Sequence, residues 1–142
     1  MNPILSAGVL IGVLCAIWTF VMGFTGWYRD PAMSPMFFLV IAIEIGGLIW
    51  GLRRTAAEGR SYQGQIVAGT LMAIVAGLII ICSSLLFTTV VFPDSLKNRG
   101  DGATPMGEAM AGFMGTLLTG IIASAIIAVF VRRRQPQAGS VV

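Results

Sequence analysis

The stretch SPMFFLVIAIEIGGLIWGL, residues 34–52, decides the fold of this chain. As an α-helix it would span about 28 Å, because each residue adds about 1.5 Å, and the hydrocarbon core of a bilayer is about 30 Å thick. Ser34 and Pro35 are typical of a helix start, and Arg53 and Arg54 follow the last apolar residue. The stretch therefore predicts a transmembrane helix.

One ionisable residue, Glu44, lies almost at the middle of this stretch. A charged side chain at the bilayer centre costs about 3 kcal/mol on insertion scales, so Glu44 is expected to face protein or water rather than lipid. Removal from water also favours the uncharged acid over the carboxylate. The sequence thus predicts a membrane bundle that encloses one energetically costly carboxyl group.

The composition of the whole chain indicates the same class of protein. Of the 142 residues, 56% are hydrophobic and 11% are charged, whereas about 25% are charged in typical soluble domains. The mean hydropathy is +0.89. The net charge of +3 comes from segments beside the apolar runs, so it indicates membrane topology rather than nucleic-acid binding. We therefore expect an integral membrane protein without a nucleic-acid partner.

Four transmembrane helices are predicted, at about residues 4–26, 34–52, 63–91 and 105–131. Short connections make consecutive helices antiparallel neighbours, so the expected fold is an all-α, antiparallel up-down-up-down four-helix bundle. The bundle forms one domain, residues 1–134, and a polar tail at 135–142 is expected to be disordered. The third helix is longer than the hydrocarbon core, so it either tilts or begins in the headgroup layer.

Small residues recur at helical spacing along all four helices, and such residues let helix backbones approach closely in membranes. Two of them, Gly47 and Gly51, share the helix face of Glu44, which predicts that this face packs into the bundle. Such a small bundle is expected to have little room for a cavity of its own. The predicted packing residues are Gly8, Gly12, Gly47, Gly51, Gly69, Gly77 and Gly112.

Antiparallel helices would bring several hydroxyl side chains to the depth of Glu44, namely Thr19, Ser83, Thr116 and Thr119. Two interpretations of this polar layer remain open. In the favoured one, a neutral Glu44 donates a hydrogen bond to a facing helix and sets the register, for about 1 kcal/mol. In the other, Glu44 is a proton or cation site. The hydroxyl groups have a structural explanation too, since they can bond to their own helix backbone.

Catalytic and metal-binding patterns are missing from the sequence. The chain has no histidine, and its two cysteines, Cys15 and Cys82, stand alone in apolar runs, without metal-ligand spacing. Nucleophile and phosphate-binding motifs are also absent. Glu108 is interpreted as a first-turn acid that complements the helix dipole. We expect no enzymatic activity, no metal and no cofactor.

The distribution of basic residues predicts the orientation. Positive residues are enriched on the cytoplasmic side of membrane proteins, and one side of the predicted bundle carries six of them against three on the other. Both termini are therefore expected in the cytoplasm. The six are Arg53, Arg54, Arg60, Arg132, Arg133 and Arg134, and the three are Arg29, Lys97 and Arg99.

The order of features from Ser61 onward resembles a bacterial family of small four-helix integral membrane proteins catalogued only as a domain of unknown function. These features are Tyr62-Gln63-Gly64 through Ala68-Gly69, a long third helix, Phe92-Pro93-Asp94, Pro105-Met106, and a final Gly/Thr-rich helix that ends in basic residues. Relatives often carry Asp-Pro where this chain has Pro93-Asp94. The resemblance supports the architecture and implies no activity and no functional residue.

Two functional hypotheses follow for a multi-pass protein of the bacterial cytoplasmic membrane. The leading one is a non-enzymatic accessory or interaction module, with membrane lipids, other membrane proteins or a second copy of the chain as partners. The alternative is a small oligomeric transporter or channel that uses Glu44 as a proton or cation site. The surroundings of Glu44 discriminate between them: a water-connected cavity favours transport, and a dry hydrogen bond favours a structural role.

Overall fold

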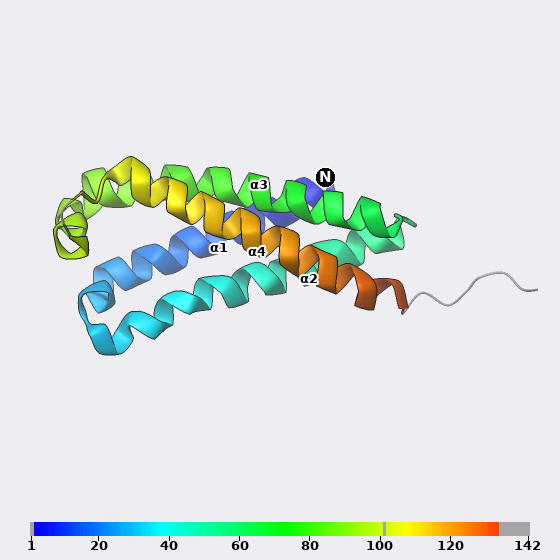
Figure 1. Ribbon diagram of the computed structural model, residues 1–142, viewed down its shortest axis with the longest axis horizontal. Coiled ribbons are helices and arrows are strands. Elements are labelled where there is room, and N and C mark those ends of the chain that lie inside the picture. Colours follow the sequence, from blue (N-terminus) through cyan, green and yellow to red (C-terminus); the bar gives the residue numbers. More distant parts are fainter. Residues whose placement is uncertain (1, 101, 134–142) are drawn as a thin grey trace, which may run out of the picture.

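The computed structural model describes residues 2–100 and 102–133, and its long elements are all helices (Figure 1). The four long helices are α1 (Pro3–Thr25), α2 (Leu39–Ala57), α3 (Tyr62–Leu86) and α4 (Pro105–Arg133). With adjoining turns included, all four are long and apolar enough to cross a membrane, and no strand occurs within the described ranges. The all-α class and the four long apolar helices are confirmed. The predicted tail, 135–142, lies outside the described residues.

The first part of the stretch that was expected to be one α-helix is a 3₁₀-helix, η2 (Pro31–Phe38). The Ala32 N–H donates a hydrogen bond to the Asp30 carboxylate at 2.9 Å, which caps the start of η2. Pro35 lacks an N–H and disfavours the α conformation at the residue before it. The chain therefore tightens through η2 and becomes α-helical only at Leu39.

The other end of α2 runs five residues beyond the predicted end, from 52 to Ala57. Thr55 is fully buried, and its hydroxyl donates to the Leu52 carbonyl at 3.1 Å and contacts Gln65 Oε1 at 2.7 Å. These contacts give the last turn a buried face. Gly59, at φ 77°, then stops the helix, because the left-handed conformation suits glycine.

The far end of α3 widens into a π-helical turn, η3 (Phe87–Val91), which is followed by a 3₁₀-helix, η4 (Pro93–Arg99). Within this turn the Thr88 hydroxyl donates to the Ser84 carbonyl at 2.8 Å. Phe87 and Thr88 are both buried. Such π turns are often found at functional sites, and this one turns an aromatic ring and a hydroxyl group towards the interior of the bundle.

The helices form two pairs that diverge towards one end of the molecule (Figure 1). Helix α3 packs against α1 and α4, while α2 contacts α1 and α4. The α1–α2 and α3–α4 connections lie together at the diverging end, and the α2–α3 connection lies at the opposite, converging end. The hydrophobic core fills the converging half, with Ile11, Leu48, Leu52 and Met72 among its most buried members.

Six of the seven predicted packing glycines leave no room for a methyl group. A Cβ atom at Gly12 would lie 2.8 Å from Ile79 Cβ, and one at Gly51 would lie 2.7 Å from Ala7 Cβ. The other four are Gly8, Gly47, Gly69 and Gly77. At Gly112 the nearest atom, Ile80 Cγ2, is 3.2 Å away, so that contact is looser. Close helix contact therefore depends on the six.

Neighbouring glycines of α2 provide a matched test of this packing. A side chain at Gly47 would collide with Ile11 of α1, whereas nothing lies within 4 Å of the Cβ position of Gly46. Gly47→Leu should lower the free energy of unfolding by about 1–3 kcal/mol through overpacking. Gly46→Leu should raise it by up to about 0.8 kcal/mol through helix propensity. Thermal melts in detergent, followed by circular dichroism, measure both, and equal melting temperatures would contradict the packing assigned to Gly47.

Candidate functional site

A cavity of about 370 Å³ lies between the diverging helix pairs, and all four long helices contribute to its wall. This cavity contradicts the expectation that so small a bundle has little room for a cavity of its own. Close glycine contacts such as that of Gly51 with Ala7 hold the helices together in the converging half, and the helix pairs diverge beyond it (Figure 1). All five residues of the predicted polar layer line this cavity, namely Thr19, Glu44, Ser83, Thr116 and Thr119.

Glu44 occupies the inner wall of the cavity, and only 2% of its surface is exposed. Its Oε1 lies close to the backbone of α4, because a Cβ atom built on Gly120 would be 3.5 Å from it. No described residue donates a hydrogen bond to this oxygen or accepts one from it. The structure thus shows no partner at Oε1 of the kind that the register-setting interpretation requires.

An unpartnered buried oxygen is energetically costly, at about 1–3 kcal/mol. Glu44 is one of the residues that line the cavity, whose volume equals that of about a dozen water molecules in the liquid. Its Oε1 is itself covered by protein atoms, so an occupant of the cavity would meet the rest of the carboxyl group.

The hydroxyl groups around Glu44 fall into two sets. Thr19 donates to the Cys15 carbonyl at 2.9 Å, and Ser83 donates to the Ile80 carbonyl at 3.1 Å. These two bond to their own helices, as hydroxyl groups in helices commonly do. By contrast, Thr116 and Thr119 of α4 make no hydrogen bond within the described part of the chain. Their hydroxyl groups can bind an occupant of the cavity.

Three aromatic residues that the sequence did not single out complete the wall, namely Tyr28, Phe37 and Phe87. The ring of Phe87 packs edge-on against those of Tyr28 and Phe20, with centroids 6.1 Å and 5.6 Å apart. Such offset contacts hold a ring in a defined orientation. Aromatic residues near the ends of membrane helices are typical of the lipid interface, so their inward position could not be distinguished in the sequence.

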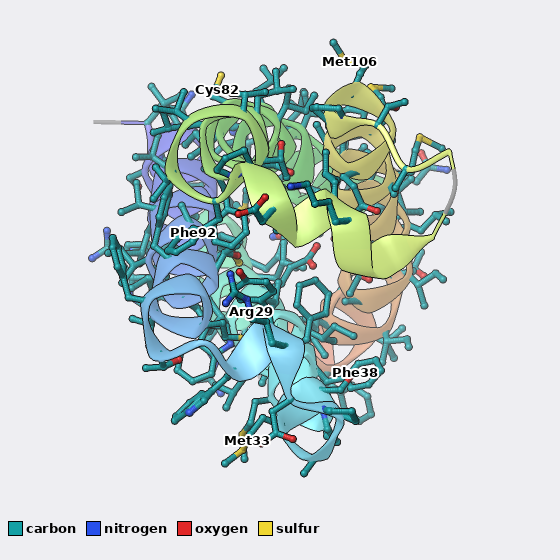
Figure 2. The ribbon with its side chains drawn as sticks, turned by 90° about the vertical axis from the view of Figure 1, so that its left-hand side faces the viewer. Arg29, Met33, Phe38, Cys82, Phe92 and Met106 are labelled. Atoms are coloured by element: carbon teal, nitrogen blue, oxygen red, sulfur yellow. The ribbon has the colours of Figure 1, made fainter. Side chains whose placement is uncertain are left out.

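The cavity extends from Glu44 to the diverging end, where the partly exposed residues Tyr28 and Glu108 line it. Glu108 is thus a second carboxyl group on the cavity wall as well as a first-turn acid of α4. Figure 2 shows this end, with Arg29 lying across its middle. The Arg29 Nε–H donates to the Tyr28 hydroxyl at 2.7 Å.

Charges at this end are of both signs. Lys97 Nζ lies 2.6 Å from Asp94 Oδ1, and both side chains are well exposed. The hydrogen bond and charge of Lys97 lower the pKa of Asp94, with a smaller contribution from Arg29, and the same hydrogen bond raises the pKa of Lys97. Among the described residues, this end therefore carries charged side chains of both signs.

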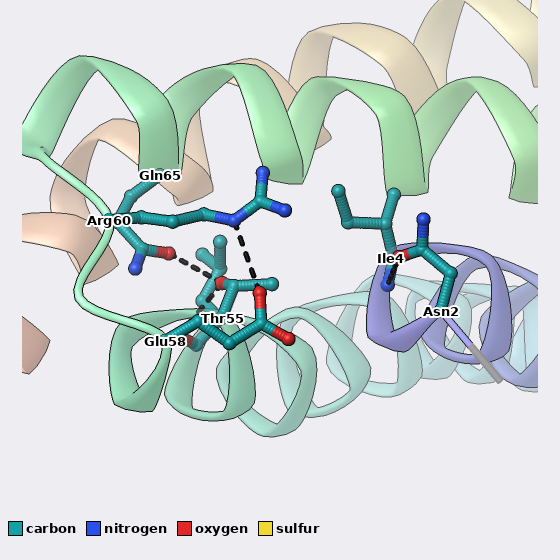
Figure 3. A network of polar contacts seen from close by, with 7 residues as sticks. Asn2, Ile4, Thr55, Glu58, Arg60 and Gln65 are labelled. Carbon is teal, nitrogen blue, oxygen red and sulfur yellow. Dashed lines mark hydrogen bonds and ion pairs between the residues drawn. The ribbon is translucent and has the colours of Figure 1, made fainter.

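The converging end carries a separate polar network (Figure 3). Thr55 and Gln65 are hydrogen-bonded and almost fully buried, and Gln65 Nε2 has no partner among the residues described. Arg60 and Glu58 form an exposed ion pair at 3.3 Å. The network joins α2 to α3 beside their connection, so its role is to close this end of the bundle.

The chain matches no protein-family model, no curated protein and no solved structure. Its resemblance to the bacterial four-helix family therefore stays a prediction. The function has to be argued from the cavity and from the carboxyl group on its inner wall.

Proposed function

We propose that this chain is a small membrane transporter that binds a proton or a small cation at Glu44. The observation that carries the proposal is a buried carboxyl group, that of Glu44, which has an unpartnered oxygen and belongs to a residue of the wall of a 370 Å³ cavity, within helices long and apolar enough to cross a membrane. Ionisable groups inside membrane proteins commonly mark ion and substrate pathways. A cavity beside the carboxyl group supports transport over the accessory-module hypothesis, which needed Glu44 to be a packing residue.

The proposal includes an arrangement in the membrane of the bacterial cell. The four helices cross in alternating directions, and both termini lie in the cytoplasm. Two observations support this: consecutive connections lie at opposite ends (Figure 1), and the sequence assigns six basic residues to the predicted side of the 53–61 connection against three to the other. The cavity then extends towards the outer face.

The proposed partners follow from the surface of the bundle. Only 11% of the most apolar window of the span containing α2 is buried, so lipid tails or a second copy of the chain cover this helix. We propose lipids as the general partner and a homo-oligomer as the assembly that uses α2. No catalytic step and no cofactor form part of the proposal.

Cysteine labelling tests the arrangement. Asp94→Cys and Glu58→Cys, each in a background in which Cys15 and Cys82 are alanine, place one thiol at each end. A membrane-impermeant maleimide should label Asp94→Cys in intact cells and Glu58→Cys only after permeabilisation. Labelling of both from the same side would contradict the alternating crossings, and the reverse pattern would invert the termini.

Flux measurements in proteoliposomes test the function. Wild type should carry protons or cations down an imposed gradient, and Glu44→Gln should reduce the flux about tenfold or more, because the amide cannot ionise. Glu58→Gln, a carboxyl-to-amide change on the exposed connection, is the matched control and should leave flux unchanged. Melting curves should agree for all three proteins. Absence of flux in wild type across pH values and cations would overturn the proposed function.

A further inference from the structure

We infer that the ligand of this cavity is a monovalent organic cation with an apolar body, such as an alkylated ammonium ion. The inference rests on the proposed function, because it needs Glu44 as the binding group, and it specifies the ligand class. It follows from the juxtaposition of one buried carboxyl group that has an unpartnered oxygen with a wall whose surface is mainly apolar and includes three aromatic rings.

The surroundings of Glu44 offer an inorganic cation few free oxygen ligands besides the carboxyl group. Inorganic divalent cations take about six or more oxygen ligands. The hydroxyl groups of Thr19 and Ser83 on the same wall already donate to their own helix backbones, which leaves those of Thr116 and Thr119. Among the described residues there is no group of three or more acidic, histidine or cysteine side chains that could hold a metal. A strongly hydrated ion would thus lose its water and find few replacements.

The wall of the cavity fits a weakly hydrated cation. Tyr28, Phe37 and Phe87 contribute rings, and Val40 and Ile80 contribute aliphatic surface. An ammonium group within about 6 Å of a ring centroid is attracted to the ring face, and quaternary ammonium ions are recognised in this way. The same wall also shields the apolar body of the cation from water. A proton bound at Glu44 would make no contact with these rings and aliphatic side chains.

The volume of the cavity and the number of its buried carboxyl groups limit the size and charge of the ligand. A volume of 370 Å³ lies at the lower end of the range for small-molecule pockets, about 300–1,000 Å³. A cation of about ten non-hydrogen atoms is therefore appropriate. Glu44 is the one nearly fully buried carboxyl group of the wall, which matches one positive charge. Glu108 lies at the other end of the cavity and makes an interaction of its own, while Arg29, Asp94 and Lys97 surround that end.

Binding of benzyltrimethylammonium to the purified full chain in mild detergent tests the inference by equilibrium dialysis. Wild type should bind the ion saturably, and Glu44→Gln should weaken binding about tenfold or more, since the charge partner is lost. Glu58→Gln should bind as wild type does. Glu44→Asp should keep most of the affinity, because charge rather than ligand geometry is recognised. Sodium, potassium and magnesium salts at equal ionic strength should not displace the ion.

A second variant guards against misfolding of Glu44→Gln. Phe37 is half exposed, so Phe37→Leu should fold normally and weaken binding several-fold by removing one ring. Equal binding by wild type and a folded Glu44→Gln, or by wild type and Phe37→Leu, would overturn the inference. Glu44-dependent flux of protons or sodium without benzyltrimethylammonium binding would overturn it and leave the proposed function standing. Absence of both flux and binding would overturn both.

Discussion

The structure depends on one constraint, namely that hydrocarbon cannot form hydrogen bonds with the chain. Every backbone group within the bilayer must therefore find a partner inside the protein, and the helix provides it. Several hydroxyl side chains follow the same rule: Thr19, Thr70 and Thr88 each donate to a carbonyl four residues earlier. Glu44, Gln65 and Ser95 each have a buried polar atom without a partner among the described residues, and of the three Glu44 is the residue that lines the cavity. The buried carboxyl group of Glu44, with its unpartnered oxygen, is the feature of the fold on which the proposed function is based.

The cavity results from an uneven distribution of small and large side chains along the bundle. In the converging half, Gly8, Gly12 and Gly51 let helices approach until backbone and side chain touch. In the diverging half, the rings of Phe87 and Phe92 both lie within 2.5 Å of where a Cβ of Gly23 would stand, and these rings also pack on each other. Aromatic side chains are large, and here their rings fill the region between the helix pairs. The cavity that Glu44 lines is next to them, and Phe87 belongs to its wall.

Hydropathy and length alone predicted four helices that are each long and apolar enough to cross a membrane, because the thickness of the bilayer demands about twenty apolar residues for each crossing. Counting depth along those helices also predicted that Thr19, Ser83, Thr116 and Thr119 share a layer with Glu44, since helix rise is constant, and all four line the cavity that Glu44 lines. The spacing of small residues predicted close helix contacts at Gly12 and Gly51, because few residues other than small ones allow helix backbones to approach so closely.

The tertiary structure alone decided the rest. Helix α2 begins at Leu39 because Pro35 disturbs the turn before it. It ends at Ala57 because Thr55 in its last turn contacts Gln65. No local sequence pattern reveals that these two residues are close. The cavity and its aromatic wall depend on how far the helix pairs diverge and on which way each helix is rotated. Hydrophobic residues cover nearly the whole circumference of these helices, so the sequence carries little signal for their rotation. The rotation of each helix is determined by contacts between side chains that are distant in the sequence. The same contacts turn Phe87 inward and leave Oε1 of Glu44 without a partner.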